Sequence, residues 1–144
     1  MKLKRGLILA VANQKGGVGK TTTALNLGAA LAIAEKKVLL VDLDPQGNLT
    51  TGLGWDKKNL SHHLYHAMVG ECPLDTLIGE TSLPFLHLIP SNRELAKVEY
   101  ELMGEDDSSM NVLRDALRSV LDRYDYVLID SPPSLGLLTV GGLC

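Results

Sequence analysis

Short, uninterrupted apolar runs constrain the fold of this chain more than any other feature. They make up residues 7–12, 38–42 and 126–130, the last two each ending in an aspartate, and a further candidate at 85–89, which contains His87, stops before Pro90. A strand buried on both faces has such a continuous run, whereas a strand with one face in water alternates apolar and polar residues. We therefore expect a mainly parallel sheet with helices covering both faces.

Helical segments separate these runs. Residues 21–35 are rich in Ala and Leu and contain no proline; Gly28, their one weak point, indicates close packing on a neighbouring element. Further helices are expected at residues 61–68 with Ser61 as the cap, at 92–103 and at 110–123, and a loop is expected at 45–55. Residues 3–42 then form a right-handed βαβ unit. The alternation predicts an α/β fold with an open, doubly wound sheet.

Length and composition fit one ordinary globular domain. The chain has 144 residues, of which 45% are hydrophobic and 22% charged, so we expect a single domain over residues 1–144. Its net charge of −3 lacks the basic excess of a domain that coats nucleic acid. A helix is starting where the chain stops, and four strands make a small sheet with exposed edges. We therefore expect the N-terminal portion of a longer fold.

The first residues resemble the start of a secretion signal. A basic start is followed by an apolar stretch at residues 6–12, but Asn13, Gln14 and Lys15 end it early, and no small-residue cleavage site follows. No stretch approaches the roughly 20 apolar residues of a membrane span. The two cysteines, Cys72 and Cys144, lack a metal-binding spacing. These features predict a reduced, cytoplasmic protein without a membrane partner.

A glycine-rich loop lies between the first apolar run and the first helix. A phosphate-binding loop needs backbone N–H groups free to point at oxygen atoms, which glycine permits, and a helix N-terminus whose dipole attracts anions. It also needs a lysine for the β and γ phosphates and a hydroxyl for Mg²⁺. The residues that meet these needs are Gly16, Gly17, Val18, Gly19, Lys20 and Thr21, with Thr22 for the α phosphate. They predict ATP and Mg²⁺ binding; the alternative is a glycine-rich turn without a ligand.

Acidic residues end two of the predicted strands. Asp42 ends the strand expected at residues 38–42, Asp44 follows it two residues later, and Asp130 ends the strand expected at residues 126–130. In open α/β sheets, ligands bind at the carboxyl ends of the strands. Asp44 can orient an attacking water or assist Mg²⁺ binding, and Asp130 can hold Mg²⁺, often through water. The alternative for each is an aspartate that merely caps a turn.

Three histidines cluster on the predicted helix at residues 61–68. His62 and His66 are four residues apart, a spacing that can bind a metal ion. No third ligand is evident from the sequence. We interpret His62, His63 and His66 as part of a solvated helix face.

Four segments together resemble the ParA/Soj branch of the ParA/MinD family of ATPases. Residues 15–21 are similar to the deviant Walker A loop of that family, and residues 42–48 to its second aspartate motif. Residues 127–135 resemble its Walker B segment, and residues 88–92 also match the branch. The loop differs from the ordinary P-loop because Gln14 stands where a glycine is usual and an extra Lys15 follows.

The resemblance implies a mechanism that spacing alone does not give. Lys15 would reach across a nucleotide-dependent homodimer to the partner's phosphates, and Lys20 would bind phosphate in its own subunit. Asp44 would position the attacking water, while Thr21, Asp44 and Asp130 would support Mg²⁺. The ATP-bound dimer would bind DNA non-specifically, associate with the nucleoid, and be stimulated by a ParB-type centromere-binding protein.

The resemblance also leaves three functions open. The first is chromosome or plasmid partitioning. The second is positioning of other cargo, such as cell-division machinery or protein clusters. The third is a nucleotide-binding fragment without hydrolysis.

Overall fold

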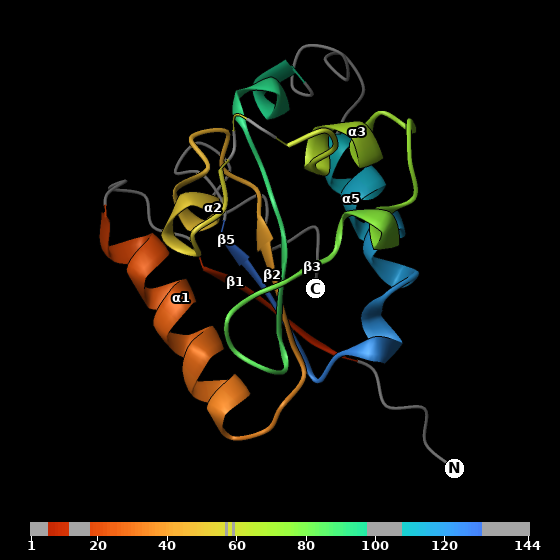
Figure 1. Cartoon of the computed structure of the whole chain (residues 1–144). Coiled ribbons are helices and arrows are strands. Elements are labelled where there is room, and N and C mark those ends of the chain that lie inside the picture. Colours follow the sequence, from red (N-terminus) through yellow and green to blue (C-terminus); the bar gives the residue numbers. More distant parts are fainter. Residues whose placement is uncertain (1–5, 12–17, 57, 59, 98–107, 131–144) are drawn as a thin grey trace.

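The computed structural model describes residues 6–11, 18–56, 58, 60–97 and 108–130, which contain a five-stranded sheet (Figure 1). The strands are β1 (Leu7–Val11), β2 (Val38–Asp42), β3 (Gly79–Glu80), β4 (Leu86–Ile89) and β5 (Tyr126–Asp130). Their order across the sheet is β1-β5-β2-β4-β3. All neighbouring pairs are parallel except β3 and β4, which are antiparallel. The predicted α/β fold with a mainly parallel sheet is confirmed.

Two features of the sheet were not predicted from the sequence. Strand β5, the last in the chain, lies between β1 and β2 and pairs with both of them. Strand β3 was not expected, because its two residues have no apolar run, and its pairing with β4 alone defines it. The four predicted strands are present, with β1 ending at Val11.

Four α-helices and three short 3₁₀ turns lie within the described residues. The helices are α1 (Val18–Ile33), α2 (Asn48–Gly52), α3 (Leu64–Met68) and α5 (Ser108–Arg118). The 3₁₀ turns are η2 (Leu74–Leu77), η3 (Arg93–Leu95) and η4 (Leu121–Arg123). No helix among these residues is long and apolar enough to cross a bilayer.

Four predictions about helices and loops need correction. The expected loop at residues 45–55 contains α2, and the cap of α3 is His63 rather than Ser61. The helix expected at 92–103 begins as the turn η3, and its part beyond residue 97 lies outside the described residues. The last predicted helix ends earlier than expected, at Arg118, and the turn η4 follows it.

Alternating strand residues build one core on each face of the sheet. On β2, Leu39 and Val41 face the cluster that contains the apolar residues of α3 and α5, whereas Val38 and Leu40 face the α1 and α2 side. Figure 1 shows α1 and α2 on one side of the sheet and α3 and α5 on the other. Because both faces are covered, β2 is buried along its whole length, as its continuous apolar run predicts.

Gly28 marks close packing of α1 on the sheet, as predicted. A Cβ atom at this position would lie 2.9 Å from Cδ2 of Leu40 and 3.3 Å from Cδ1 of Leu86. A glycine in mid-helix costs helix propensity, but here it lets the helix approach β2 and β4 closely.

Candidate phosphate and metal site

The carboxyl ends of the central strands bring the predicted acidic residues together. Asp42 and Asp130 are directly opposite each other on the parallel neighbours β2 and β5, and Val11 of β1 is level with Asp130 on its other side. Both carboxyl groups are fully buried. The chain that leaves β1 at this edge returns as α1, which begins at Val18. The sheet therefore presents its acidic residues where α1 begins.

A hydrogen bond joins the start of α1 to the end of β5. The Thr21 hydroxyl Oγ1 donates to Oδ2 of Asp130 over 2.9 Å, across 109 positions of sequence. These are the hydroxyl and the carboxylate that the sequence assigned to Mg²⁺. Hydroxyl and carboxylate oxygens are the hard ligands that Mg²⁺ prefers, so the pair fits that ion.

The backbone around Asp44 is fixed by neighbouring elements. Ser91, which follows β4, donates its hydroxyl to the Asp44 carbonyl oxygen over 2.8 Å, and Gly47 N–H donates to the same oxygen over 2.9 Å. The carboxylate Oδ1 of Asp44 accepts from Gln46 N–H over 3.0 Å. The structure therefore holds Asp44 in a tight turn, and its side chain is 9% exposed at the edge that carries Asp130.

Some of the predicted phosphate-binding residues lie outside the described part of the chain. Lys15, Gly16 and Gly17 lie outside the described residues, and Val18, Gly19 and Lys20 form the start of α1. Thr22 follows Thr21 within the first turns of the same helix. A helix N-terminus at this edge supplies the free N–H groups and the positive dipole end that a phosphate requires.

The sequence predicted that Asp42 ends a strand but assigned it no role in the site. Its carboxylate accepts three hydrogen bonds: from Thr50 Oγ1 over 2.6 Å, from Thr50 N–H over 2.9 Å and from Asp44 N–H over 3.2 Å. Thr50 Oγ1 in turn accepts from Ser91 N–H over 3.1 Å. Asp42 thus ties α2 and the chain after β4 to the turn that carries Asp44. A threonine eight residues after a strand-ending aspartate was the available signal.

Burial changes the acidity of Asp42. Loss of solvent raises the pKa of this carboxyl from 3.8 to about 6, because the hydrogen bonds from Thr50 offset burial only in part. The Asp130 carboxylate beside it raises the pKa further. The two aspartates thus form a buried acidic pair on neighbouring strands, an arrangement that a bound cation would stabilise.

Stability should depend on the ionisation of Asp42. Its pKa is about 6 in the folded chain and 3.8 ordinarily, so between these values the folded chain binds more protons than the unfolded chain. The free energy of unfolding should therefore fall by about 3 kcal/mol in total as pH rises from about 3 to 7, most of it between the two pKa values. Urea denaturation without Mg²⁺ at several pH values measures this slope.

A matched pair of substitutions assigns that slope. Asp42→Asn removes the titrating group and should flatten the profile, whereas Asp122→Asn, at an exposed carboxyl, should leave the profile as in the wild type. Equal slopes in the wild type and Asp42→Asn would show that another group titrates there.

The predicted solvated histidine face is wrong for one of its members. His63 is 1% exposed and lies within the fold, whereas His62 is exposed. His63 is the N-cap of α3, and its backbone N–H donates to Nδ1 of His66 over 3.1 Å. The sequence placed the three residues on one helix, but the helix begins only after His63.

Comparisons with known proteins agree with this geometry. A profile of the protein family described as AAA domain matches residues 6–144. The chromosome partitioning protein ParA of Myxococcus xanthus is 49% identical over 138 residues, which are 96% of this chain and 48% of that protein. The sporulation initiation inhibitor protein Soj of Bacillus subtilis is 48% identical, covering 96% of this chain and 54% of Soj. The chain spans about half the length of the curated relatives it matches.

Solved structures of nucleotide-bound proteins also match this fold. Cobyrinic acid a,c-diamide synthase from Mycobacterium smegmatis, with a bound ATP analog and magnesium, matches with a TM-score of 0.86 at 43% identity. That match covers 96% of this chain and 56% of the synthase. Cyanothece McdA in complex with ATP matches with a TM-score of 0.84 at 29% identity, covering 96% of this chain and 53% of McdA.

Proposed function

We propose that this chain, which belongs to the AAA domain family and is of the ParA/Soj type, binds and hydrolyses Mg·ATP in chromosome or plasmid partitioning. The observation that carries the proposal is the 2.9 Å hydrogen bond between Thr21 and Asp130. It joins the hydroxyl at the start of α1 to the aspartate that ends β5, as a P-loop ATPase requires. The chain would act as a single domain over residues 1–144.

The proposed roles follow the position of each residue. The N–H groups of the loop and of the first turn of α1, with the Lys20 ammonium, would bind the phosphates. The residues of this cradle are Lys15, Gly16, Gly17, Val18, Gly19, Lys20, Thr21 and Thr22. Thr21 and Asp130 would hold Mg²⁺, which neutralises phosphate charge when it is bound.

Asp44 would orient the attacking water. Its backbone is held by Ser91 and Gly47, and its carboxylate lies two residues beyond Asp42, at the edge that carries Asp130. A positioned carboxylate lowers the entropy lost when water and phosphate meet. Because Asp44 is less buried than Asp42, it is also the better placed of the two to assist the metal.

Partner proposals rest on the similarity to ParA and Soj. The chain would dimerise with ATP through Lys15, bind DNA non-specifically as a dimer, and respond to a ParB-type protein. It would act in the cytoplasm, on the nucleoid. Because the net charge of this chain is −3, much of any DNA-binding surface would lie in the additional sequence of the longer relatives.

A second function, positioning of other cargo, is favoured by a specific observation. McdA, with a TM-score of 0.84, and the cell division ATPase MinD of Pyrococcus furiosus, with 0.76 at 29% identity, have the same fold over 96% of this chain. The neighbouring genes distinguish the two functions, because a ParB-type gene beside this one would favour DNA partitioning over positioning of other cargo.

Phosphate release from Mg·ATP tests the proposed function. The chain should release phosphate, and Lys20→Ala should reduce this to background because the β and γ phosphates lose their cation. Lys36→Ala, at an exposed lysine beyond the end of α1, is the matched control and should keep the wild-type rate. No release above the Lys20→Ala background would favour a nucleotide-binding fragment without hydrolysis.

A further inference from the structure

His63 is a buried side chain without hydrogen bonds. It is 1% exposed, and neither Nδ1 nor Nε2 has a hydrogen-bond partner among the described residues. Its nearest charged neighbour is Oε1 of Glu94, 3.8 Å from Nε2, which is too long for a hydrogen bond. Buried polar atoms are normally paired, so a histidine in this position calls for an explanation.

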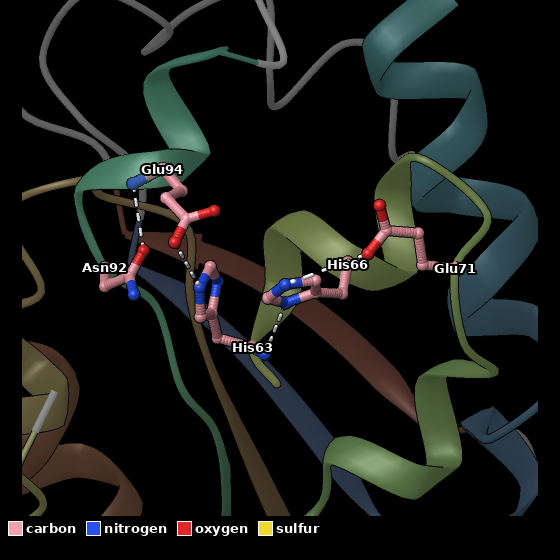
Figure 2. A network of polar contacts seen from close by, with 5 residues as sticks. All are labelled: His63, His66, Glu71, Asn92 and Glu94. Carbon is pink, nitrogen blue, oxygen red and sulfur yellow. Dashed lines mark hydrogen bonds and ion pairs between the residues drawn. The ribbon is translucent and has the colours of Figure 1, made fainter. Parts of the chain in front are cut away.

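Two further ligating side chains surround this histidine (Figure 2). One ligand atom from each of His63, His66 and Glu94 lies within 4.8 Å of the other two. In tetrahedral zinc sites with bonds of about 2.0–2.1 Å, ligand atoms lie about 3.3 Å apart. The 3.8 Å between His63 and Glu94 therefore suits two ligands of one metal ion better than a direct contact. Glu94, at 46% exposure, has the freedom to close the difference.

Both ring nitrogens of His66 face a partner, so a metal ion must replace one of these contacts. Its Nδ1 accepts from the His63 backbone N–H over 3.1 Å, so the proton of the neutral ring is on Nε2. Nε2 faces Oε2 of Glu71 at 3.8 Å (Figure 2). A carboxylate behind a histidine is the usual outer partner of a metal ligand, because it fixes the tautomer. The lone pair for a metal is therefore on Nδ1, and binding would replace the bond from His63.

The backbone that carries Glu94 is also fixed. Asn92 Oδ1 accepts from Glu94 N–H over 2.9 Å and caps the turn η3 (Figure 2). His63, the N-cap of α3, places its buried ring beside the Glu94 carboxylate. The imidazole of His63 and the carboxylate of Glu94 thus come from two separate elements, the N-cap of α3 and the turn η3.

We propose that His63, His66 and Glu94 bind a divalent transition metal ion, with Zn²⁺ as the best match. Two imidazoles and one carboxylate suit Zn²⁺, whereas Mg²⁺ prefers oxygen ligands alone. Three protein ligands leave a fourth position for water or another group. The metal joins α3 to η3, which begins two residues after Ser91, and the Ser91 hydroxyl holds the Asp44 backbone. The site is separate from the nucleotide site and does not depend on the proposed function.

Calorimetric titration of the full chain with Zn²⁺, in a large excess of Mg²⁺, tests this site. The excess Mg²⁺ occupies the oxygen ligands at the carboxyl edge of the sheet. Wild-type protein should bind Zn²⁺ and melt at a higher temperature with it. His66→Ala and Glu94→Gln, at partly exposed positions, should each weaken binding at least about tenfold. Both avoid the buried His63, whose loss would affect folding.

His62→Ala is the matched control. His62 is exposed, its ring lies 5.0 Å from that of His66, and it lines a cavity with Cys72. This variant should bind Zn²⁺ like the wild type. Loss of binding with His62→Ala alone would place the metal beside Cys72 and overturn the proposal. Absence of Zn²⁺ binding, or equal binding in all four proteins, would overturn it too.

Discussion

Replacing Asp130 by asparagine is expected to lower Mg²⁺-dependent phosphate release at least about 100-fold, which corresponds to about 3 kcal/mol of transition-state stabilisation. Asparagine has nearly the same shape, and its oxygen can still accept the Thr21 hydroxyl, which lies 2.9 Å from the carboxylate. The negative charge that would hold Mg²⁺ is lost. Phosphate release at increasing Mg²⁺ concentration measures the effect.

The same substitution has a second expected result and a matched control. Removal of the Asp130 charge should lower the pKa of Asp42, because the Asp130 carboxylate raises it. Asp115→Asn, at an exposed carboxyl of α5, should change neither phosphate release nor that pKa. Wild-type release by Asp130→Asn would remove Asp130 from the metal site.

Replacing Lys15 by alanine is expected to abolish ATP-dependent dimerisation and leave nucleotide binding by the monomer within a few-fold. If Lys15 contacts the phosphates of the second subunit, a single chain keeps the glycines and Lys20 of its own loop. The dimer loses the cation at its centre, where a charge-assisted contact with phosphate is strong. Light scattering with a non-hydrolysable ATP analogue and Mg²⁺ measures this directly.

Lys36→Ala is the control for the loss of one positive charge. Lys36 is exposed and lies beyond the carboxyl end of α1, far along the helix from the loop. Its replacement should leave the dimer intact. Dimers that survive Lys15→Ala, or monomers that lose nucleotide binding with it, would contradict the role in trans.

Local patterns predicted the sheet well wherever burial alone defines a strand. The runs that became β2 and β5 are buried because helices cover both faces, and each ends on an aspartate at the carboxyl edge. The motifs assigned both Thr21 and Asp130 to Mg²⁺, and the carboxyl edge of the parallel sheet brings these two side chains together.

The elements that sequence reasoning missed depend on partners distant in the chain. Helix α2 has five mostly polar residues and forms where Thr50 donates to Asp42. Strand β3 is defined only by its pairing with β4. Strand β5 comes last among the strands in sequence, yet it lies between β1 and β2 in the sheet. No local pattern contains this information.

The metal-ligating cluster was missed for a similar reason. The i, i+4 pattern pointed to His62 and His66. The buried ligand is His63, which is the N-cap, because α3 begins at Leu64 and not at residue 61. Its third partner, Glu94, follows β4 and is brought near by the sheet order. The pattern within residues 61–68 cannot reveal Glu94, because Glu94 lies outside that segment.

Binding of Mg·ATP is the central claim, and isothermal titration with a non-hydrolysable ATP analogue tests it most directly. The wild-type chain should bind the analogue with Mg²⁺ and more weakly without it. Thr21→Val, which keeps the side-chain shape but removes the hydroxyl bonded to Asp130, should lose that dependence on Mg²⁺. Thr21→Ser should retain it. Equal binding by wild type and Thr21→Val, or no binding by the wild type, would contradict the account.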